Sequence, residues 1–201
     1  MKNIRSKTGS RIGQSIAMLC LLLCSFSCQT NDSRSGSSLH LSLDQPLQML
    51  DPRTARTLND CNVLRFLFEG LTKTGKGGGT ELALAKSVSV LDNGLRYVFV
   101  LHPGKWSNGD SVTAYDFEWS WKSILDPAFP TDLAYQLYPI KNGRSCRMGL
   151  TLPEEVGVRA LDASTLEVVL EKPIPYFLEL VSMTSFLPVN PKLAASNSQW
   201  H

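Results

Sequence analysis

A polar turn followed by helix-start signals, in residues 105–127 (KWSNGDSVTAYDFEWSWKSILDP), constrains the fold more than any other part of the sequence. Turn-forming residues come first, and Thr113 then offers an N-cap oxygen with Asp116 three residues later, the pattern of a capping box. Apolar residues recur with helical spacing until Pro127, which disfavours helix at the residue before it. The segment therefore predicts a turn and a helix that packs on a core and ends near Asp126.

Two further segments have the alternation and turn chemistry of β-hairpins. Residues 87–102 place β-rich runs on either side of an Asn-Gly pair, which tolerates the positive φ angles of a tight turn. Residues 156–170 alternate apolar and polar positions on either side of the turn LDAST. A proline-led helix is expected over 171–183, then a short strand ending in a proline turn over 185–194. Hairpins followed by helices predict an α+β chain with a mixed sheet and packed helices.

The N-terminal half contains three weaker signals. Residues 39–43 alternate like a strand, and a helix is expected after Asn59 or Asp60, either of which could cap it, with Gly70 as its stop. The glycine-rich stretch 72–80 does not match a phosphate-binding loop and follows no strand. It is therefore expected to form a hairpin-like excursion.

Residues 1–27 have the composition of an export signal, with four basic residues, no acidic residue and the apolar run 16–23. The apolar run is too short for a transmembrane anchor, which needs about 20 residues. Small residues precede Cys28, so this cysteine is a candidate for lipid attachment, although the preceding residues match a lipobox only in part and conventional cleavage nearby is the alternative. Residues 28–38 are polar and are expected to form a tether.

Loss of this signal would change the charge of the chain. Residues 1–27 hold four of the 20 Lys and Arg and none of the 18 Asp and Glu, so the net charge would fall from +2 to −2. No basic stripe with interleaved aromatics remains, which argues against nucleic-acid binding. Cys61 and Cys146 would remain; they could pair in an oxidising compartment or be buried thiols, and their spacing suggests neither a metal site nor a cofactor.

The sequence also lacks the motifs of an exported hydrolase. Beyond the signal, the histidines are His40, His102 and His201, and neither G-x-S-x-G nor H-E-x-x-H is present. Asp110 and Asp116 could form a carboxylate pair, but one falls in the predicted turn and the other at a helix N-terminus. The chain is therefore not expected to be an enzyme.

Several sequence blocks, taken together, resemble one protein family: LDPRTA, LFEGLTK, SVSVLDNGLRYVFVLHPGKWSNGDSVTAYDFEWSWKSILDP, VGVRALDASTLEVVLEKPIPYFLELV and FLPVNP. Their order and spacing are similar to those of the oligopeptide- and dipeptide-type solute-binding proteins of ABC transporters, the bacterial extracellular solute-binding proteins of family 5. The resemblance covers residues 39–201. It implies the N-terminal part of a two-lobed, class II periplasmic-binding-protein fold.

Family members are more than twice as long, so residues 39–201 are expected to form an incomplete N-terminal lobe. Such proteins close two lobes over an extended peptide, and the aspartate that pairs with the peptide amine in many members lies outside this part. By resemblance, ligand contacts in the present part are expected at Gln45, Pro46, Leu47 and Tyr135. For each position, an ordinary surface or core role is the alternative.

The function implied by the resemblance is capture of oligopeptides outside the cytoplasmic membrane for delivery to an ABC permease. The implied partners are the peptide, the permease subunits, the membrane through a lipid anchor, and a C-terminal lobe if one is encoded separately. The alternatives are a non-binding structural lipoprotein and a nonfunctional remnant of a split gene.

Overall fold

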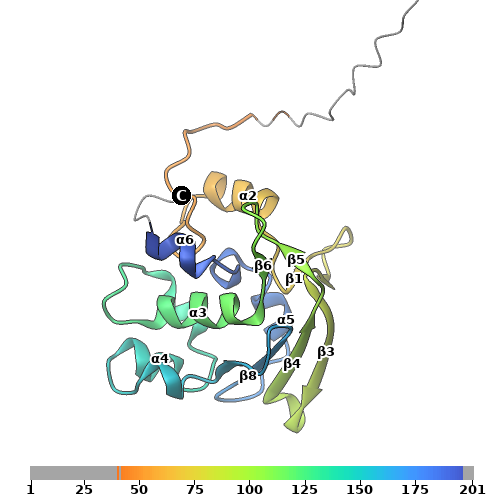
Figure 1. The fold of residues 1–201 in the computed structure, drawn as a ribbon, viewed down its shortest axis with the longest axis vertical. Helices are drawn as coiled ribbons and strands as arrows, with labels where there is room; N and C mark the ends of the chain where they lie inside the picture. The colour runs from red at the N-terminus through yellow and green to blue at the C-terminus, as the bar shows by residue number, and fades with distance from the viewer. Residues whose placement is uncertain (1–39, 41, 197–201) are drawn as a thin grey trace, which may run out of the picture. The chain divides into compact units, whose positions relative to one another are not determined.

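A four-stranded sheet with the strand order β3-β4-β8-β7 forms the framework of the computed structural model (Figure 1). The strands are β3 (Ala85–Leu91), β4 (Arg96–Leu101), β7 (Val158–Ala160) and β8 (Thr165–Val169). Both predicted hairpins are present, and all neighbouring strands are antiparallel. The α+β class is confirmed, but within the described residues the sheet is antiparallel rather than mixed, because β3–β4 and β7–β8 are hairpins and the central strands β4 and β8 also pair antiparallel.

The structure describes residues 40 and 42–196. Two units are distinguished, Met1–Ser42 and Leu43–His201, and all the helices and strands named below belong to the second. The predicted export signal 1–27, Cys28 and the predicted tether 28–38 lie outside the described residues. The strand predicted over 39–43 is not supported where the chain is described, because His40, Ser42 and Leu43 have no strand geometry.

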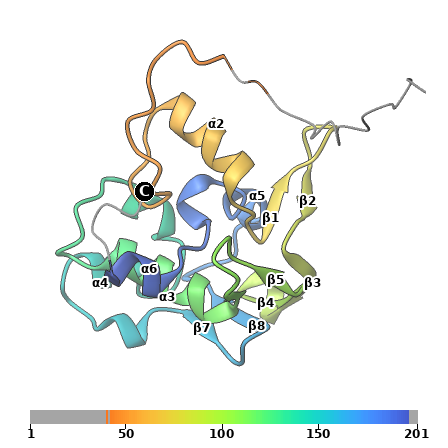
Figure 2. The same cartoon turned by 45° about the horizontal axis from the view of Figure 1, so that its top comes forward.

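Two small hairpins extend the fold. β1 (Thr72–Thr74) pairs with β2 (Thr80–Leu82), so the glycine-rich stretch is a hairpin, as predicted, and Figure 2 shows it projecting from the unit. β5 (Gly104–Lys105) pairs with β6 (Ser111–Val112) around the polar turn. This second hairpin leads directly into helix α3.

Helix α3 (Ala114–Leu125) begins and ends where the sequence predicts. The Asp116 carboxylate accepts hydrogen bonds from the Thr113 backbone N–H at 2.9 Å and from Trp106 Nε1 at 3.0 Å. One side chain thus joins the polar turn to the first turn of the helix. The apolar face of α3 packs on β7 and β8, and the fully buried Trp121 donates from Nε1 to the Phe186 carbonyl at 2.9 Å.

Helix α2 (Leu58–Leu67) differs at both ends from the prediction. Its N-cap is Thr57, whose hydroxyl accepts from the Asp60 backbone N–H at 3.1 Å, so neither Asn59 nor Asp60 is the cap. The helix ends because Phe68 adopts an extended conformation, before Gly70 is reached. A Cβ at Gly70 would lie 3.2 Å from Leu187 Cδ2, so this glycine serves close packing instead.

The C-terminal part is built from short helical segments. They are η2 (Leu133–Leu137), α4 (Gly143–Arg147), η3 (Pro153–Glu155), α5 (Phe177–Leu180), η4 (Thr184–Phe186) and α6 (Pro191–Ser196). The strand predicted over 185–194 is wrong, because η4 and the start of α6 occupy this stretch. Asn190 Oδ1 accepts from the Lys192 and Leu193 backbone N–H groups at 3.0 and 3.2 Å and so favours helix from Pro191.

Cys61 and Cys146 are both free thiols. Cys146 is buried in the main core, and burial raises the pKa of its thiol. Cys61 is half-buried on α2, with its sulfur 3.6 Å from Thr184 Oγ1. The sequence left open whether these two cysteines form a disulfide or remain thiols, and the structure shows thiols. No helix in residues 40 and 42–196 is long and apolar enough to cross a bilayer.

A buried ion pair fixes the segment that precedes α2. Arg53 Nη2 lies 2.7 Å from Asp51 Oδ2, and the two side chains are 7% and 6% exposed. The guanidinium carbon also lies 5.1 Å from the ring centre of Trp119 on α3 and 4.6 Å from that of Phe129. Thr131 Oγ1 donates to the Arg53 carbonyl at 2.7 Å. Three separate parts of the chain therefore meet at Arg53.

We expect Asp116→Ala to lower the free energy of unfolding by about 1–3 kcal/mol, because it leaves the Thr113 N–H and the Trp106 indole N–H without their acceptor. Asp110→Ala is the matched control, since Asp110 lies in the same turn but is 40% exposed. Its expected effect is within about 0.5 kcal/mol. Urea unfolding followed by tryptophan fluorescence measures the free energy of unfolding of both variants. Equal losses would contradict the role of Asp116 as the acceptor that joins the turn to the helix.

We expect Arg53→Met to destabilise the fold by about 3–5 kcal/mol, because the Asp51 carboxylate would stay buried without its cation. Arg56→Met breaks the ion pair with Asp132, whose side chains are 57% and 75% exposed, and should cost less than about 1 kcal/mol. Thermal or chemical unfolding of the two variants provides the comparison. A loss below about 1 kcal/mol for Arg53→Met would show that the buried pair is not essential.

Candidate functional site

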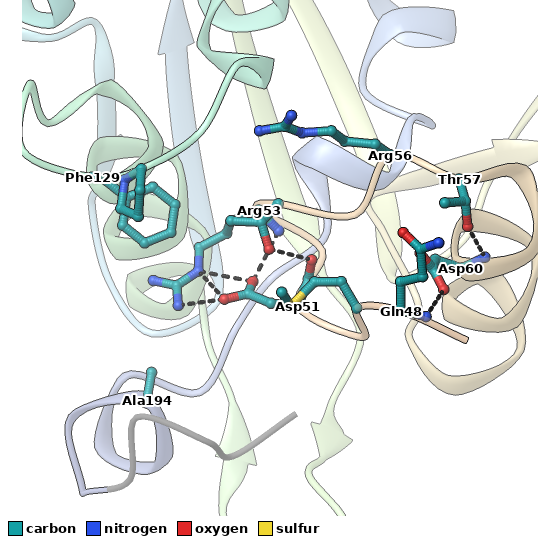
Figure 3. Close-up of a pocket in the computed structure, with 11 residues that line it drawn as sticks. Gln48, Asp51, Arg53, Arg56, Thr57, Asp60, Phe129 and Ala194 are labelled. Carbon is teal, nitrogen blue, oxygen red and sulfur yellow. Dashed lines mark hydrogen bonds and ion pairs between the residues drawn. The ribbon is translucent and has the colours of Figure 1, made fainter. Parts of the chain in front are cut away.

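A hollow of about 630 Å³ lies between the segment before α2, the loop before η2 and helix α6 (Figure 3). Its volume is within the range of roughly 300–1,000 Å³ that small-molecule sites occupy. Three of the four buried charged side chains in the described part of the chain line it: Asp51, Arg53 and Asp60. The other lining residues are Gln48, Met49, Thr54, Arg56, Thr57, Phe129, Pro130 and Ala194.

The first two charged groups neutralise each other. Asp51 Oδ1 accepts from Arg53 Nε at 3.0 Å and from the Arg53 backbone N–H at 2.9 Å, in addition to the ion pair at Oδ2. Figure 3 shows the two side chains facing each other, with the Phe129 ring beside the guanidinium. This pair builds the wall of the hollow and has little capacity left for a ligand.

Asp60 is different, because it is buried without a full set of partners. Its side chain lies in the first turn of α2, where the helix dipole favours negative charge, and the residue is 1% exposed. Oδ1 accepts from the Gln48 backbone N–H at 2.9 Å, whereas Oδ2 has no hydrogen-bond partner. A carboxylate oxygen in this state can accept a hydrogen bond from a molecule in the hollow.

Arg56 also lines the hollow and carries the most exposed charge in it. Its Nη1 lies 2.8 Å from Asp132 Oδ2, and both side chains are more than half exposed. An ion pair of this kind contributes little stability and is exchanged easily. The hollow therefore combines a buried, neutralised pair, a buried carboxylate and a weakly held guanidinium.

Three of the four predicted ligand residues directly precede a lining residue in the sequence, and none of the three lines the hollow itself. Gln45, Pro46 and Leu47 are exposed and lead directly into Gln48, which lines it. The Gln45 carbonyl accepts from Asn59 Nδ2 at 3.1 Å, which ties this stretch to the start of α2. Their role in ligand binding stays a prediction.

Tyr135 is not among the residues that line the hollow. It lies on η2 with 60% of its surface exposed, and its hydroxyl accepts from Gln136 Nε2 at 3.4 Å. Asp132, the partner of Arg56, immediately precedes η2. The structure thus places Tyr135 on the surface and outside the lining of the hollow, and its ligand role also stays a prediction.

The three tryptophans of residues 105–127 have structural roles. Trp106 and Trp121 are held by their indole N–H groups, and Trp119 packs on Arg53. His102 is exposed at the end of β4, and its backbone N–H donates to the Leu84 carbonyl at 2.8 Å. Within residues 40 and 42–196, no group of three His, Cys, Asp or Glu side chains could hold a metal ion.

The residues that define the hollow are not predicted from the sequence. Asp51 and Arg53 stand in the block LDPRTA, but nothing local predicts that the pair is buried or that Trp119 and Phe129 enclose the guanidinium. Asp60 is a candidate helix cap in the sequence, and its real role in the first turn depends on Thr57. A charged pair on either side of a proline, in the block LDPRTA, is the one available signal.

Comparison with known proteins identifies the family. Residues 80–200 match the model of the bacterial extracellular solute-binding proteins, family 5 Middle. The chain is 37% identical over 171 residues to the oligopeptide-binding protein OppA of Bacillus subtilis, covering 85% of this chain and 31% of that protein. It is 34% identical over 159 residues to the periplasmic murein peptide-binding protein MppA of Escherichia coli, covering 78% of this chain and 29% of that protein.

Solved structures agree with this assignment. The substrate-binding domain of an oligopeptide ABC transporter from Bacillus anthracis matches with a TM-score of 0.72 and 38% identity, covering 73% of this chain and 29% of that one. Listeria monocytogenes OppA bound to peptide matches with a TM-score of 0.71 and 36% identity, covering 73% of this chain and 29% of that one.

The chain spans about three tenths of the length of the curated relatives that it matches. The similarity confirms the expected class II periplasmic-binding-protein fold. The family consists of substrate-binding proteins of ABC transporters and not of enzymes, which agrees with the absence of hydrolase motifs from the sequence. This chain belongs to the bacterial extracellular solute-binding proteins of family 5.

Proposed function

We propose that this chain is the N-terminal portion of a peptide-binding protein that captures oligopeptides outside the cytoplasmic membrane and delivers them to an ABC permease. The observation that carries the proposal is the similarity to OppA of Bacillus subtilis over 85% of this chain. Dipeptide-binding protein DppE of the same organism is 41% identical over 68% of the chain. Relatives named for peptide binding therefore match most of this chain.

The proposed ligand surface combines the hollow with the predicted contacts. Gln45, Pro46 and Leu47 immediately precede the lining residue Gln48, and Tyr135 would add a hydroxyl from η2. An extended peptide presents alternating N–H and C=O groups, which the polar lining of the hollow can match. This argument rests on the hydrogen-bonding chemistry of the lining residues. The contacts of the peptide with the four predicted residues are part of the proposal.

The proposed location follows from the family and from residues 1–27. The family is extracellular, and the relative MppA is named periplasmic. We propose export by the N-terminal signal and anchoring of the protein to the outer side of the cytoplasmic membrane through a lipid on Cys28. The permease subunits would be the partners that receive the ligand.

The principal alternative is a chain without ligand-binding activity, either a structural lipoprotein or a remnant of a split gene. The ligand class is a second question, because one relative, YgiS of Escherichia coli, is named as a probable deoxycholate-binding protein at 34% identity over 70% of this chain. Family membership alone therefore does not determine that the ligand is a peptide. Direct measurement with peptides separates these alternatives.

We expect the melting temperature of the full chain to rise by several degrees in a millimolar mixture of di- to pentapeptides. Binding at a hundred times the dissociation constant contributes about 2.7 kcal/mol to the folded state. Tyr135→Phe removes one proposed ligand hydrogen bond from an exposed position, so its melting temperature without peptide should be unchanged and its shift smaller. An unchanged midpoint with every peptide, in a chain that melts cooperatively, would contradict peptide binding.

We further propose that a separate C-terminal lobe, where one is encoded, completes the fold. The relatives contain more than twice the length that this chain matches, and Phe66 and Leu67 on α2 are 63% and 61% exposed. A tagged full chain, extracted in mild detergent, should retain a polypeptide that matches the remaining part of the family fold. Phe66→Ser with Leu67→Ser should release it, whereas a solitary wild-type chain would contradict the assembly.

A further inference from the structure

One buried carboxylate oxygen in the hollow has no hydrogen-bond donor. Asp60 is 1% exposed, and its Oδ2 atom is one of two buried side-chain polar atoms in the described part of the chain that have no partner. The other is a Thr151 hydroxyl, which does not line the hollow. A buried ionised oxygen without a donor is unfavourable, so an incoming donor at this position would gain more than a surface contact.

The cations around Asp60 are engaged elsewhere. The Arg53 guanidinium is held by Asp51 and by the rings of Trp119 and Phe129. Arg56 is paired with Asp132, and Figure 3 shows its side chain extending away from Asp60. The Thr57 hydroxyl accepts from the Asp60 backbone N–H and therefore faces the backbone of the same helix turn. None of these groups donates a hydrogen bond to Oδ2, so a ligand could supply the donor.

We propose that the hollow binds a primary ammonium group at the Asp60 carboxylate. A charge-assisted N–H donor suits an ionised oxygen whose carboxylate already has one backbone hydrogen bond at its other atom. A metal ion suits the site less well, because the described residues offer no cluster of ligating side chains. Asp60 is among the residues that line the 630 Å³ hollow, which leaves room for the rest of a ligand.

The natural source of the ammonium group rests on the proposed function: it would be the amino terminus or a lysine side chain of a peptide. The site itself rests on Asp60 alone. It is distinct from the amine-binding aspartate that the family resemblance implies, because that residue lies outside this part of the fold. The proposal therefore assigns a charge-selective contact to the N-terminal lobe.

The direct test uses n-butylammonium chloride and the full chain in mild detergent, followed by backbone amide NMR. The amide resonances of Gln48 and Asp60 should shift saturably, because the Gln48 N–H donates to the same carboxylate. Tetramethylammonium, which has charge but no N–H, and sodium chloride at equal ionic strength should not reproduce the shift. Equal shifts with all three salts, or none with butylammonium, would overturn the site and leave Oδ2 to water alone.

Two variants sharpen this test. Asp60→Asn keeps the shape of the side chain and an acceptor for the Gln48 N–H, and it should abolish the saturable shift. Glu81→Gln makes the same change of charge on the exposed hairpin strand β2 and should leave the shift intact. Should Asp60→Asn unfold, the comparison of butylammonium with tetramethylammonium in the wild type still decides the question. Retention of the shift in folded Asp60→Asn would overturn the proposal.

Peptide probes separate this inference from the proposed function. Trialanine should bind at least tenfold more tightly than N-acetyl-trialanine, and Asp60→Asn should remove the difference. Peptide binding without a response to butylammonium would support the function and overturn the ammonium site. A butylammonium response without binding of either peptide would support the site and contradict the peptide function.

Discussion

The buried pair of Asp51 and Arg53 is the interaction on which the N-terminal segment depends. Isolated burial of either charge would be strongly unfavourable, so the two can be buried only together and with their remaining hydrogen bonds satisfied. Arg53 meets this condition through Asp51, Ser123 and the two aromatic rings, and its carbonyl is held by Thr131. These contacts join the segment before α2 to α3 and to the loop before η2, and so they hold the walls of the hollow together.

The pair also explains why Asp60 stands out. In the same hollow, Asp51 has an internal cation and Asp60 has only the backbone of Gln48 and the start of its own helix. Both carboxylates are buried to a similar degree, so the difference lies in hydrogen bonding rather than in burial. The fold thus satisfies one buried carboxylate completely and leaves one oxygen atom of its neighbour without a donor.

The elements that could be predicted from the sequence are those determined by neighbouring residues. Helix α3 follows from Thr113 and Asp116, and both sheet hairpins follow from their alternation and turns. The errors lie where a local signal competes with another. Thr57 caps α2 ahead of Asn59 and Asp60, and Asn190 favours a helix in a stretch whose pattern favours a strand. The hollow was not predictable, because Arg53 reaches Ser123 across 70 residues of sequence.

The charges of the hollow limit how a zwitterionic ligand could lie in it. Its ammonium end has an unused acceptor at Asp60, whereas a ligand carboxylate would meet no unused buried cation among the described lining residues, because Arg53 is committed to Asp51. Arg56 is the lining cation whose present ion pair is exposed and therefore costs little to exchange. This difference between Asp60 and Arg56 favours an orientation in which the ammonium group of the ligand lies at Asp60 on α2 and its carboxylate lies toward Arg56.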